Sequence, residues 1–138
     1  RAYGGCGGVP VGKVGGAGQL PVPTVRERSI PVQADLVASN DQIAAGERHY
    51  NNYCAVCHGL AVRSGGSIPD LRRMSEGTHT AFNQIVQDGL LAANGMAAFD
   101  DVLSNEDTTM IHHYVRARAE QDRLAAAGEV SMGQLTWQ

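Results

Sequence analysis

The sequence predicts an all-α domain of several short helices behind an irregular N-terminal arm. Apolar residues recur at spacings of three and four in three stretches between residues 39 and 119, which is typical of helices with one buried face. No βαβ pattern is visible. Aromatic residues make up only 5% of the 138 residues, so a helical core needs a further apolar body to pack against.

The first 38 residues differ in composition from the rest of the chain. Eight glycines lie between residues 4 and 18, and three prolines follow between residues 21 and 31. This pattern favours a linker or an extended arm, and it leaves open both disorder and packing along a neighbouring domain. We therefore expect an arm or interdomain linker over 1–38, a folded domain over 39–127 and a tail over 128–138. Because the chain starts at Arg1 rather than Met, we expect it to be processed or cut from a longer one.

The first helix is predicted to begin at residues 39–41, Ser-Asn-Asp, whose side chains can cap free backbone N–H groups. One of its faces is formed by Ile43, Gly46, Tyr50 and Cys54. A glycine inside a helix costs stability relative to alanine, so we expect another helix to approach closely at Gly46. Tyr50, one turn later, would cover that crossing, whereas His49 is expected to face solvent.

The helix leads into Cys54-Ala55-Val56-Cys57-His58, a C-x-x-C-H motif. This spacing is the signature of covalent haem attachment, in which both thiols add to vinyl groups and the histidine binds the iron. The alternatives are a chance match, a structural disulfide and half of a zinc site. A zinc site would need a second Cys or His pair at finger spacing, and the remaining thiol, Cys6, lies far upstream. We therefore predict one covalent haem c, held by Cys54 and Cys57 and ligated by His58.

Candidate partners for such a haem follow in the next loop, which has its flexible point at residues 65–66, Gly-Gly. An iron-bound histidine needs an acceptor at its other ring nitrogen, and the carbonyl of Pro69 is free for that role. Leu71 could cover the haem face. Arg72 or Arg73 could pair with a propionate, because arginine suits carboxylates in a bidentate geometry. The alternative is that both arginines are ordinary solvated residues.

A second helical stripe is predicted after Thr78 or Thr80, with Phe82, Ile85, Val86 and Gly89 on one face. The next loop contains Met96, which we take as the sixth iron ligand. A thioether opposite histidine raises the reduction potential and suits electron transfer. The alternatives are that Met96 fills the core, or that a bis-His haem uses His79, His112 or His113. Its position after Gly95 and before the last helix favours the ligand.

The last helix is predicted to open at residues 104–107, Ser-Asn-Glu-Asp, which is close to a capping box. Its inner face is formed by Ile111, Tyr114, Val115 and Arg118. Met110 is expected to lie in the core rather than on the iron, and His112 and His113 on the surface. Gly128 is expected to end the helix.

Charge and hydropathy limit the class of partner. A net charge of −3 does not favour nucleic-acid binding, and no apolar run is long enough to span a bilayer. Thioether attachment is carried out on the exported side of bacterial membranes, so the motif implies the periplasm. Cys6 could be free or paired with another chain.

The order of these features resembles a class I cytochrome c, over about Ser39 to Ala119. Gly46, Tyr50 and Tyr114 match the helix crossing of that family. A narrower likeness is to the C-terminal haem domain of soluble, type II quinohaemoprotein alcohol dehydrogenases. The residues that carry it are Cys54–Gly59, Ser64–Arg72, Gly95–Met96 and Tyr114–Val115.

The resemblance implies an electron carrier that keeps His58 and Met96 on the iron and has no catalytic residue of its own. In that alcohol dehydrogenase family a β-propeller holding pyrroloquinoline quinone (PQQ) and calcium oxidises the alcohol. The resemblance therefore implies that such a propeller is the electron donor and that a small soluble redox protein is the acceptor. The alternatives are a free-standing periplasmic monohaem cytochrome c of a respiratory chain, and a haem sensor or peroxidase-like protein in which Met96 leaves the iron.

Overall fold

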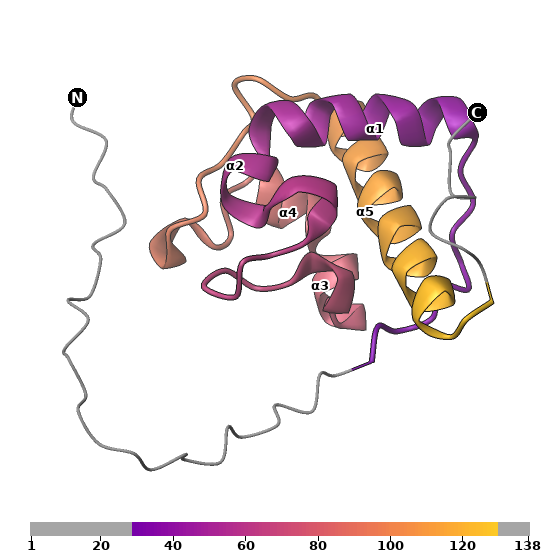
Figure 1. Ribbon diagram of the computed structural model, residues 1–138. Helices are drawn as coiled ribbons and strands as arrows, with labels where there is room; N and C mark the ends of the chain where they lie inside the picture. Colours follow the sequence, from indigo (N-terminus) through magenta and orange to yellow (C-terminus); the bar gives the residue numbers. More distant parts are fainter. Residues whose placement is uncertain (1–28, 130–138) are drawn as a thin grey trace, which may run out of the picture.

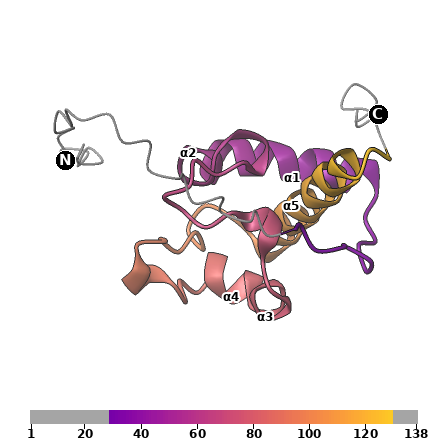
Figure 2. The same cartoon turned by 60° about the horizontal axis from the view of Figure 1, so that its bottom comes forward.

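The computed structural model describes residues 29–129 and shows a helical domain (Figure 1). Its α-helices are α1 (Asn40–Tyr53), α2 (Ala55–His58), α3 (Glu76–Thr80), α4 (Phe82–Val86) and α5 (Asn105–Ala126). Its 3₁₀ helices are η1 (Leu60–Val62), η2 (Leu71–Arg73) and η3 (Ala92–Asn94). Residues 29–129 contain no strand, so the predicted all-α fold is confirmed. Figure 2 shows α1 and α5 on one side of the domain and α3 and α4 on the other.

Helix α1 begins where the sequence places it, at a capping box. The Ser39 hydroxyl accepts the N–H of Gln42 at 3.2 Å, and the Gln42 side chain accepts the N–H of Ser39 at 2.9 Å. Two backbone donors that the first turn leaves free are thereby satisfied. Ile43, Gly46 and Tyr50 are the buried residues of the helix, as the predicted face requires.

The two long helices cross at Gly46. A Cβ atom on Gly46 would lie 1.9 Å from the Met110 carbonyl oxygen and 2.9 Å from Tyr114 Cβ, so only glycine allows this approach. The rings of Tyr50 and Tyr114 pack beside the crossing with centroids 5.3 Å apart, and both residues are fully buried. The predicted close approach, and its cover by Tyr50, are confirmed. Met110 contributes its backbone to this contact, and its side chain is half-buried.

The hydrophobic core is aliphatic apart from three aromatic rings. Its buried members are Ile43, Tyr50, Val62, Met74, Phe82, Val86, Leu103, Ile111, Tyr114, Val115 and Ala117. They come from α1, η1, α4 and α5 and from the turns between these elements. This small core includes the two tyrosines of the crossing, and α5 contributes four of its members.

Helix α5 has both of its predicted ends. A second capping box opens it, in which Ser104 and Asp107 exchange hydrogen bonds of 2.9 and 3.1 Å. The other end carries the paired hydrogen bonds of a Schellman motif: Gly128 N–H binds the Ala125 carbonyl and Glu129 N–H binds the Leu124 carbonyl. Gly128 has φ +73°, the left-handed conformation that this motif needs.

The predicted second stripe corresponds to α4, which a short helix, α3, precedes. Ser75 caps α3 by accepting the N–H of Thr78, and the chain bends at Ala81 before α4 starts. Phe82, Ile85 and Val86 are buried, as expected. The fold therefore has the predicted start and buried face, but α4 ends before Gly89, which has φ +68°, and α3 is a separate short helix ahead of this stretch.

The expectation that His112 and His113 lie on the surface is wrong. Both are half-buried, and Nδ1 of His113 is buried without a hydrogen-bond partner. The His112 ring stacks on Phe82 with centroids 4.3 Å apart, and its Nε2 atom lies 2.9 Å from Nδ1 of His79. The predicted buried face of α5 is too narrow, because α3 and α4 cover a flank of this helix that helical spacing alone leaves exposed.

The segment before α1 packs on the domain. Gln33 is buried, its N–H donates to Glu120 at 3.1 Å, and its side-chain oxygen accepts from Arg116 at 3.0 Å. The end of the predicted arm nearest to α1 thus lies against α5. Residues 1–28, with Cys6, and residues 130–138 lie outside the described part of the chain.

We predict that Gly46→Ala destabilises the protein by about 3 kcal/mol or more, because the methyl group would force apart two packed helices. Urea denaturation should give this loss in the free energy of unfolding. Gly77→Ala on α3 is the matched control, since its new Cβ would meet only Ser75 Oγ, at 3.9 Å. That variant should be as stable as the parent or about 0.5 kcal/mol more stable. Equal effects of both changes would contradict the close crossing.

We also predict a loss of stability between about pH 6.5 and pH 4. Burial, followed by the charges of His79, Arg116 and His113, lowers the pKa of His112 from 6.5 to about 4. The unfolded chain therefore binds a proton in this range that the folded chain excludes, and stability falls as the pH falls. After allowance for solvent screening of the half-buried ring, the effect should be roughly 1–2 kcal/mol.

Denaturation at a series of pH values measures this dependence. His112→Gln should make the decline smaller, whereas His49→Gln, which removes a half-exposed histidine paired with Asp107, should leave it in place. A decline that is unchanged in His112→Gln would show that other groups cause it.

Candidate functional site

The C-x-x-C-H motif forms a short helix at the end of α1. Cys54 lies between α1 and α2, and its carbonyl accepts the N–H groups of Cys57 at 3.2 Å and His58 at 2.9 Å. Residues three apart on a helix share a face, so the two thiols point to one side. Both cysteines are free, with Cys54 half-buried and Cys57 exposed. Burial, followed by the charge of Cys57, raises the pKa of Cys54 to about 11, which keeps that thiol protonated at neutral pH.

A tight turn follows His58 and is fixed to the core. Gly59 has φ +84°, and a Cβ atom there would lie 2.0 Å from the Arg63 carbonyl oxygen. The buried Tyr50 hydroxyl donates to the Gly59 carbonyl at 2.7 Å. The helix crossing and the motif are thus connected through a single side chain.

The next residues are strained. Ala61 and Val62 have φ of 54° and 62°, a left-handed conformation that β-branched residues rarely adopt. Each such residue costs about 1–3 kcal/mol and persists only where its surroundings hold it. Val62 is fully buried in the core, which supplies that restraint.

One ring nitrogen of His58, Nδ1, is buried, and no hydrogen bond to it meets normal geometry. Burial lowers the pKa of His58, and the nearby Pro69 carbonyl opposes that shift. The imidazole is therefore neutral at pH 7, which is the form that binds metals. Pro69 lies where the sequence analysis expects the acceptor, although the contact falls short of a full hydrogen bond.

Three predicted site residues pack against the core. Cys54, Leu71 and Met96 are partly buried and pack against the core cluster, although they come from three separate segments. Met96 follows Gly95, which turns the chain with φ +95°, and the Met96 N–H donates to the Leu91 carbonyl at 3.3 Å. The ligand role of Met96 and the covering role of Leu71 remain predictions.

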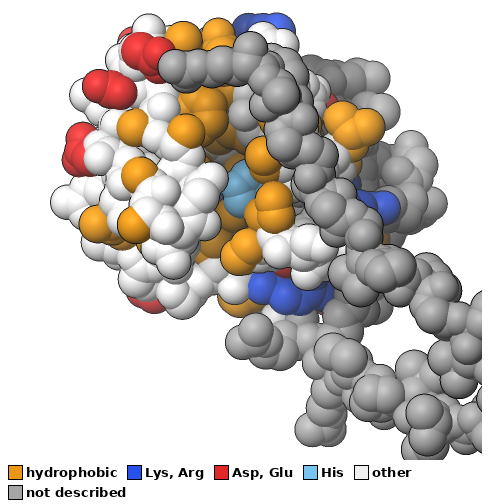
Figure 3. Space-filling model, turned by 90° about the vertical axis from the view of Figure 1, so that its left-hand side faces the viewer, with side chains coloured by type: hydrophobic (Ala, Val, Ile, Leu, Met, Phe, Trp, Pro, Cys, Tyr) orange, Lys and Arg blue, Asp and Glu red, His pale blue; other side chains and the backbone are white. Residues whose placement is uncertain are grey.

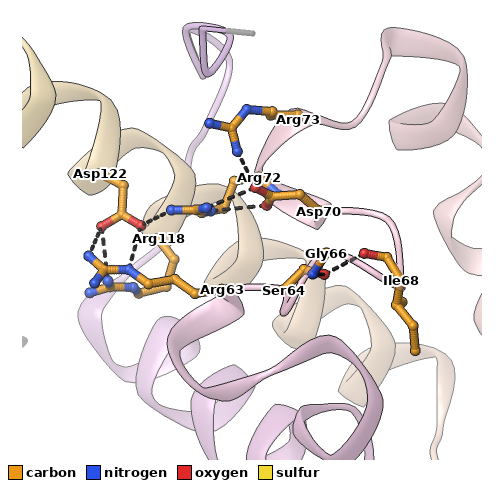
Figure 4. A network of polar contacts seen from close by, with 9 residues as sticks. All are labelled: Arg63, Ser64, Gly66, Ile68, Asp70, Arg72, Arg73, Arg118 and Asp122. Carbon is orange, nitrogen blue, oxygen red and sulfur yellow. Dashed lines mark hydrogen bonds and ion pairs between the residues drawn. The ribbon is translucent and has the colours of Figure 1, made fainter. Parts of the chain in front are cut away.

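Arg72 belongs to a partly buried network of charges (Figure 4). It donates to Asp70 through Nε at 3.0 Å and Nη2 at 2.8 Å, and to Asp122 through Nη1 at 2.8 Å. Arg73 also binds Asp70. The guanidinium group of Arg72 has five N–H bonds, and the three side-chain hydrogen bonds use three of them. The remaining two could still bind a propionate, and that contact stays a prediction.

The sequence analysis did not single out Asp122. A carboxylate in the last turns of a helix opposes the helix dipole, so an aspartate there indicates partners elsewhere in the fold. That signal could have identified it.

The surface near α2 carries many apolar side chains (Figure 3). Figure 3 shows hydrophobic side chains around a hollow that has a histidine side chain at its floor. Val56 of α2 and Leu60 of the adjoining η1 are large apolar side chains exposed to solvent, and later in the chain Leu90, Leu91 and Val102 are exposed as well. Free thiols, a buried imidazole nitrogen without a partner and uncovered apolar side chains together fit a haem bound at the motif. A haem would take the thiols and cover apolar surface that water otherwise contacts.

Two further tests concern metals and membranes. Within residues 29–129, no three His, Cys, Asp or Glu side chains come together as a metal site. None of the helices in this part of the chain is long and apolar enough to cross a membrane.

Comparison with known proteins agrees with this site. Residues 41–115 match the family described as "Cytochrome C oxidase, cbb3-type, subunit III". The chain is 40% identical over 111 residues to quinohemoprotein alcohol dehydrogenase ADH IIB of Pseudomonas putida. The aligned segment covers 80% of this chain and 16% of that protein. The chain is also 34% identical over 82 residues to cytochrome c550 of Pseudomonas aeruginosa, which covers 54% of each.

A solved structure gives the same result. The fold matches quinohemoprotein alcohol dehydrogenase ADHIIG from Pseudomonas putida HK5 with a TM-score of 0.63 and 33% identity, over 80% of this chain and 15% of that one. The chain thus spans about one sixth of the length of these dehydrogenases. The predicted fold and family are confirmed: the chain belongs to the cytochrome c family of the cbb3 subunit III type and is homologous to the C-terminal cytochrome c domain of quinohemoprotein alcohol dehydrogenases.

Proposed function

We propose that this domain transfers electrons through one covalently bound haem c and serves a PQQ-dependent alcohol dehydrogenase. The observation that carries the proposal is the C-x-x-C-H helix, with both thiols free and the buried His58 nitrogen without a partner. Relatives named quinohemoprotein alcohol dehydrogenase support the second part. A haem c supplies an iron that accepts and releases one electron at a time.

The residues of this chain divide the work of holding that group. Cys54 and Cys57 would form the two thioether links, and His58 would give its neutral imidazole to the iron. Met96 would supply the second protein ligand, so the iron would have no site for a substrate. Leu71 would cover the haem, and Arg72 would bind a propionate. We assign no catalytic residue to this domain.

The electron donor in this proposal is reduced PQQ in a calcium-containing propeller domain, and the acceptor is a small soluble redox protein. Residues 1–38 act as the arm or linker that joins the two domains, 39–127 form the cytochrome domain and 128–138 a tail. A tether of this kind keeps donor and acceptor at high effective concentration. The compartment is the periplasm, where thioether attachment takes place.

A second candidate function is that of a free-standing periplasmic monohaem cytochrome c. The similarity to cytochrome c550, which covers 54% of that protein, favours it. A haem sensor or peroxidase-like protein is a third class, and it needs Met96 to leave the iron. Carbon monoxide binding to the reduced protein would indicate this third class.

The gene that encodes this chain provides the test. Its complete product, given PQQ, calcium and an alcohol, should reduce its own haem, whereas residues 1–138 alone should not. The haem should stay on the denatured chain through acid-acetone extraction, because thioethers survive that treatment. Extractable haem would contradict covalent attachment. A gene that encodes only a leader peptide before Arg1 would leave the free cytochrome as the function.

Replacement of Met96 tests the sixth ligand. The ferric protein should show the weak near-infrared band of iron–methionine bonding, and Met96→Ala should abolish that band and lower the reduction potential. Met110→Ala is the matched control, because Met110 lies half-buried on α5 at the helix crossing. The control should keep the band. Persistence of the band in Met96→Ala would mean that another residue is the ligand.

A further inference from the structure

Asp122 accepts hydrogen bonds from three arginines that belong to different parts of the chain (Figure 4). Arg63, just after η1, donates through Nε at 3.3 Å and Nη2 at 3.0 Å. Arg72 of η2 donates through Nη1 at 2.8 Å, and Arg118 of α5 through Nη2 at 3.0 Å. Both oxygens of one carboxylate are therefore shared among three guanidinium groups.

The position of Asp122 disfavours its negative charge for two reasons, burial and the helix dipole. The side chain is 5% exposed and lies in the last turns of α5, where the helix dipole disfavours a negative charge. Burial would raise the pKa of Asp122, but hydrogen bonds from Arg63 and Arg72 outweigh it and hold the pKa below its ordinary value. With Asp70 and Arg73 included, two carboxylates face four guanidinium groups.

A continuous set of contacts leads from Asp122 to the site. Arg72, bound to Asp122, also holds both oxygens of Asp70. Asp70 caps η2 by accepting the N–H of Arg72 at 3.0 Å. The residue before it is Pro69, whose carbonyl lies near the ring of His58. The chain is thus fastened to α5 at Arg72, three residues after Pro69, whose carbonyl lies near the imidazole.

The loop that leads to Pro69 offers few other restraints. Ser64 binds the carbonyl of Ile68 and the N–H of Gly66, so these contacts close the loop on itself. Gly65 and Gly66 have room for a Cβ atom, with no other atom within 4 Å, and Pro69 itself is exposed. Beside the packing of Leu71 and Met74 on the core, the charge network fastens this segment to α5 through polar contacts.

We propose that Asp122 is a positioning residue for the electron-transfer site: through Arg72 and Asp70 it holds the Pro69 carbonyl beside Nδ1 of His58. This inference rests on the function proposed above. When Nε2 of His58 binds iron, Nδ1 carries the proton and requires an acceptor. Pro69 then fixes the orientation of the ring and raises its basicity.

Two measurements on the haem-loaded protein test the proposal with Asp122→Asn. The His58 Nδ1 proton, followed by NMR, should exchange with solvent at least tenfold faster, because its acceptor is no longer held. The reduction potential should rise, because a weaker acceptor on the imidazole and the loss of a negative charge both favour ferrous iron. Asp122→Glu restores the carboxylate and should return both values toward those of the parent protein.

Glu120→Gln is the matched control. Glu120 lies two residues away on the same helix, and its carboxylate binds Arg123 outside the network. Its removal should leave the exchange of the Nδ1 proton unchanged. If Asp122→Asn does not fold, Arg72→Lys keeps the positive charge, cannot bind both carboxylates in the same way, and should accelerate the same exchange.

The results that overturn the proposal are distinct. Unchanged Nδ1 exchange in the haem-loaded variants overturns it while leaving the function intact. An equal acceleration of the backbone amide protons of α5 would assign Asp122 to general stability, and this also overturns it. A wild-type chain that holds no reducible haem overturns both this inference and the function on which it rests.

Discussion

The crossing of α1 and α5 at Gly46 is the contact on which the rest of the structure depends. Because Gly46 has no side chain, the Met110 carbonyl can lie against it, and the rings of Tyr50 and Tyr114 can pack beside it. Tyr50 then donates to Gly59, the residue that ends the C-x-x-C-H helix. The distance between the helices therefore sets the position of the motif relative to the core.

The other end of α5 restrains the opposite side of the site. Asp122 fastens η2, and with it Pro69, at a point more than two turns beyond the crossing. One long helix thus fixes both the backbone that carries His58 and the backbone that faces its buried nitrogen. This explains how a domain with few aromatic side chains can place a histidine accurately: the restraints are a backbone contact and a charge network rather than a large core.

The parts of the fold that follow local rules could be predicted from the sequence. They include the helix ends and the crossing, marked by Ser39, Gly46, Ser104 and Gly128. The parts that depend on distant partners could not. Gln33 is buried by residues 83 and 87 positions away, and His112 by α3 and α4. The partners of Asp122 could not be predicted for the same reason, since two of its three arginines lie 50 and 59 residues earlier. Spacing indicates which face of a helix is apolar, but it does not indicate which element covers the flank.

The small core also gives a reason for covalent attachment in the proposed carrier. A cofactor held only by contacts has different affinities for its two redox states whenever the protein shifts its potential, because potential and affinity are linked. Thioether links through the half-buried Cys54 and the exposed Cys57 would separate these two properties. The charges of Arg72 and Asp122 could then shift the potential without releasing the haem. The haem would at the same time serve as the apolar body that the uncovered side chains around α2 require.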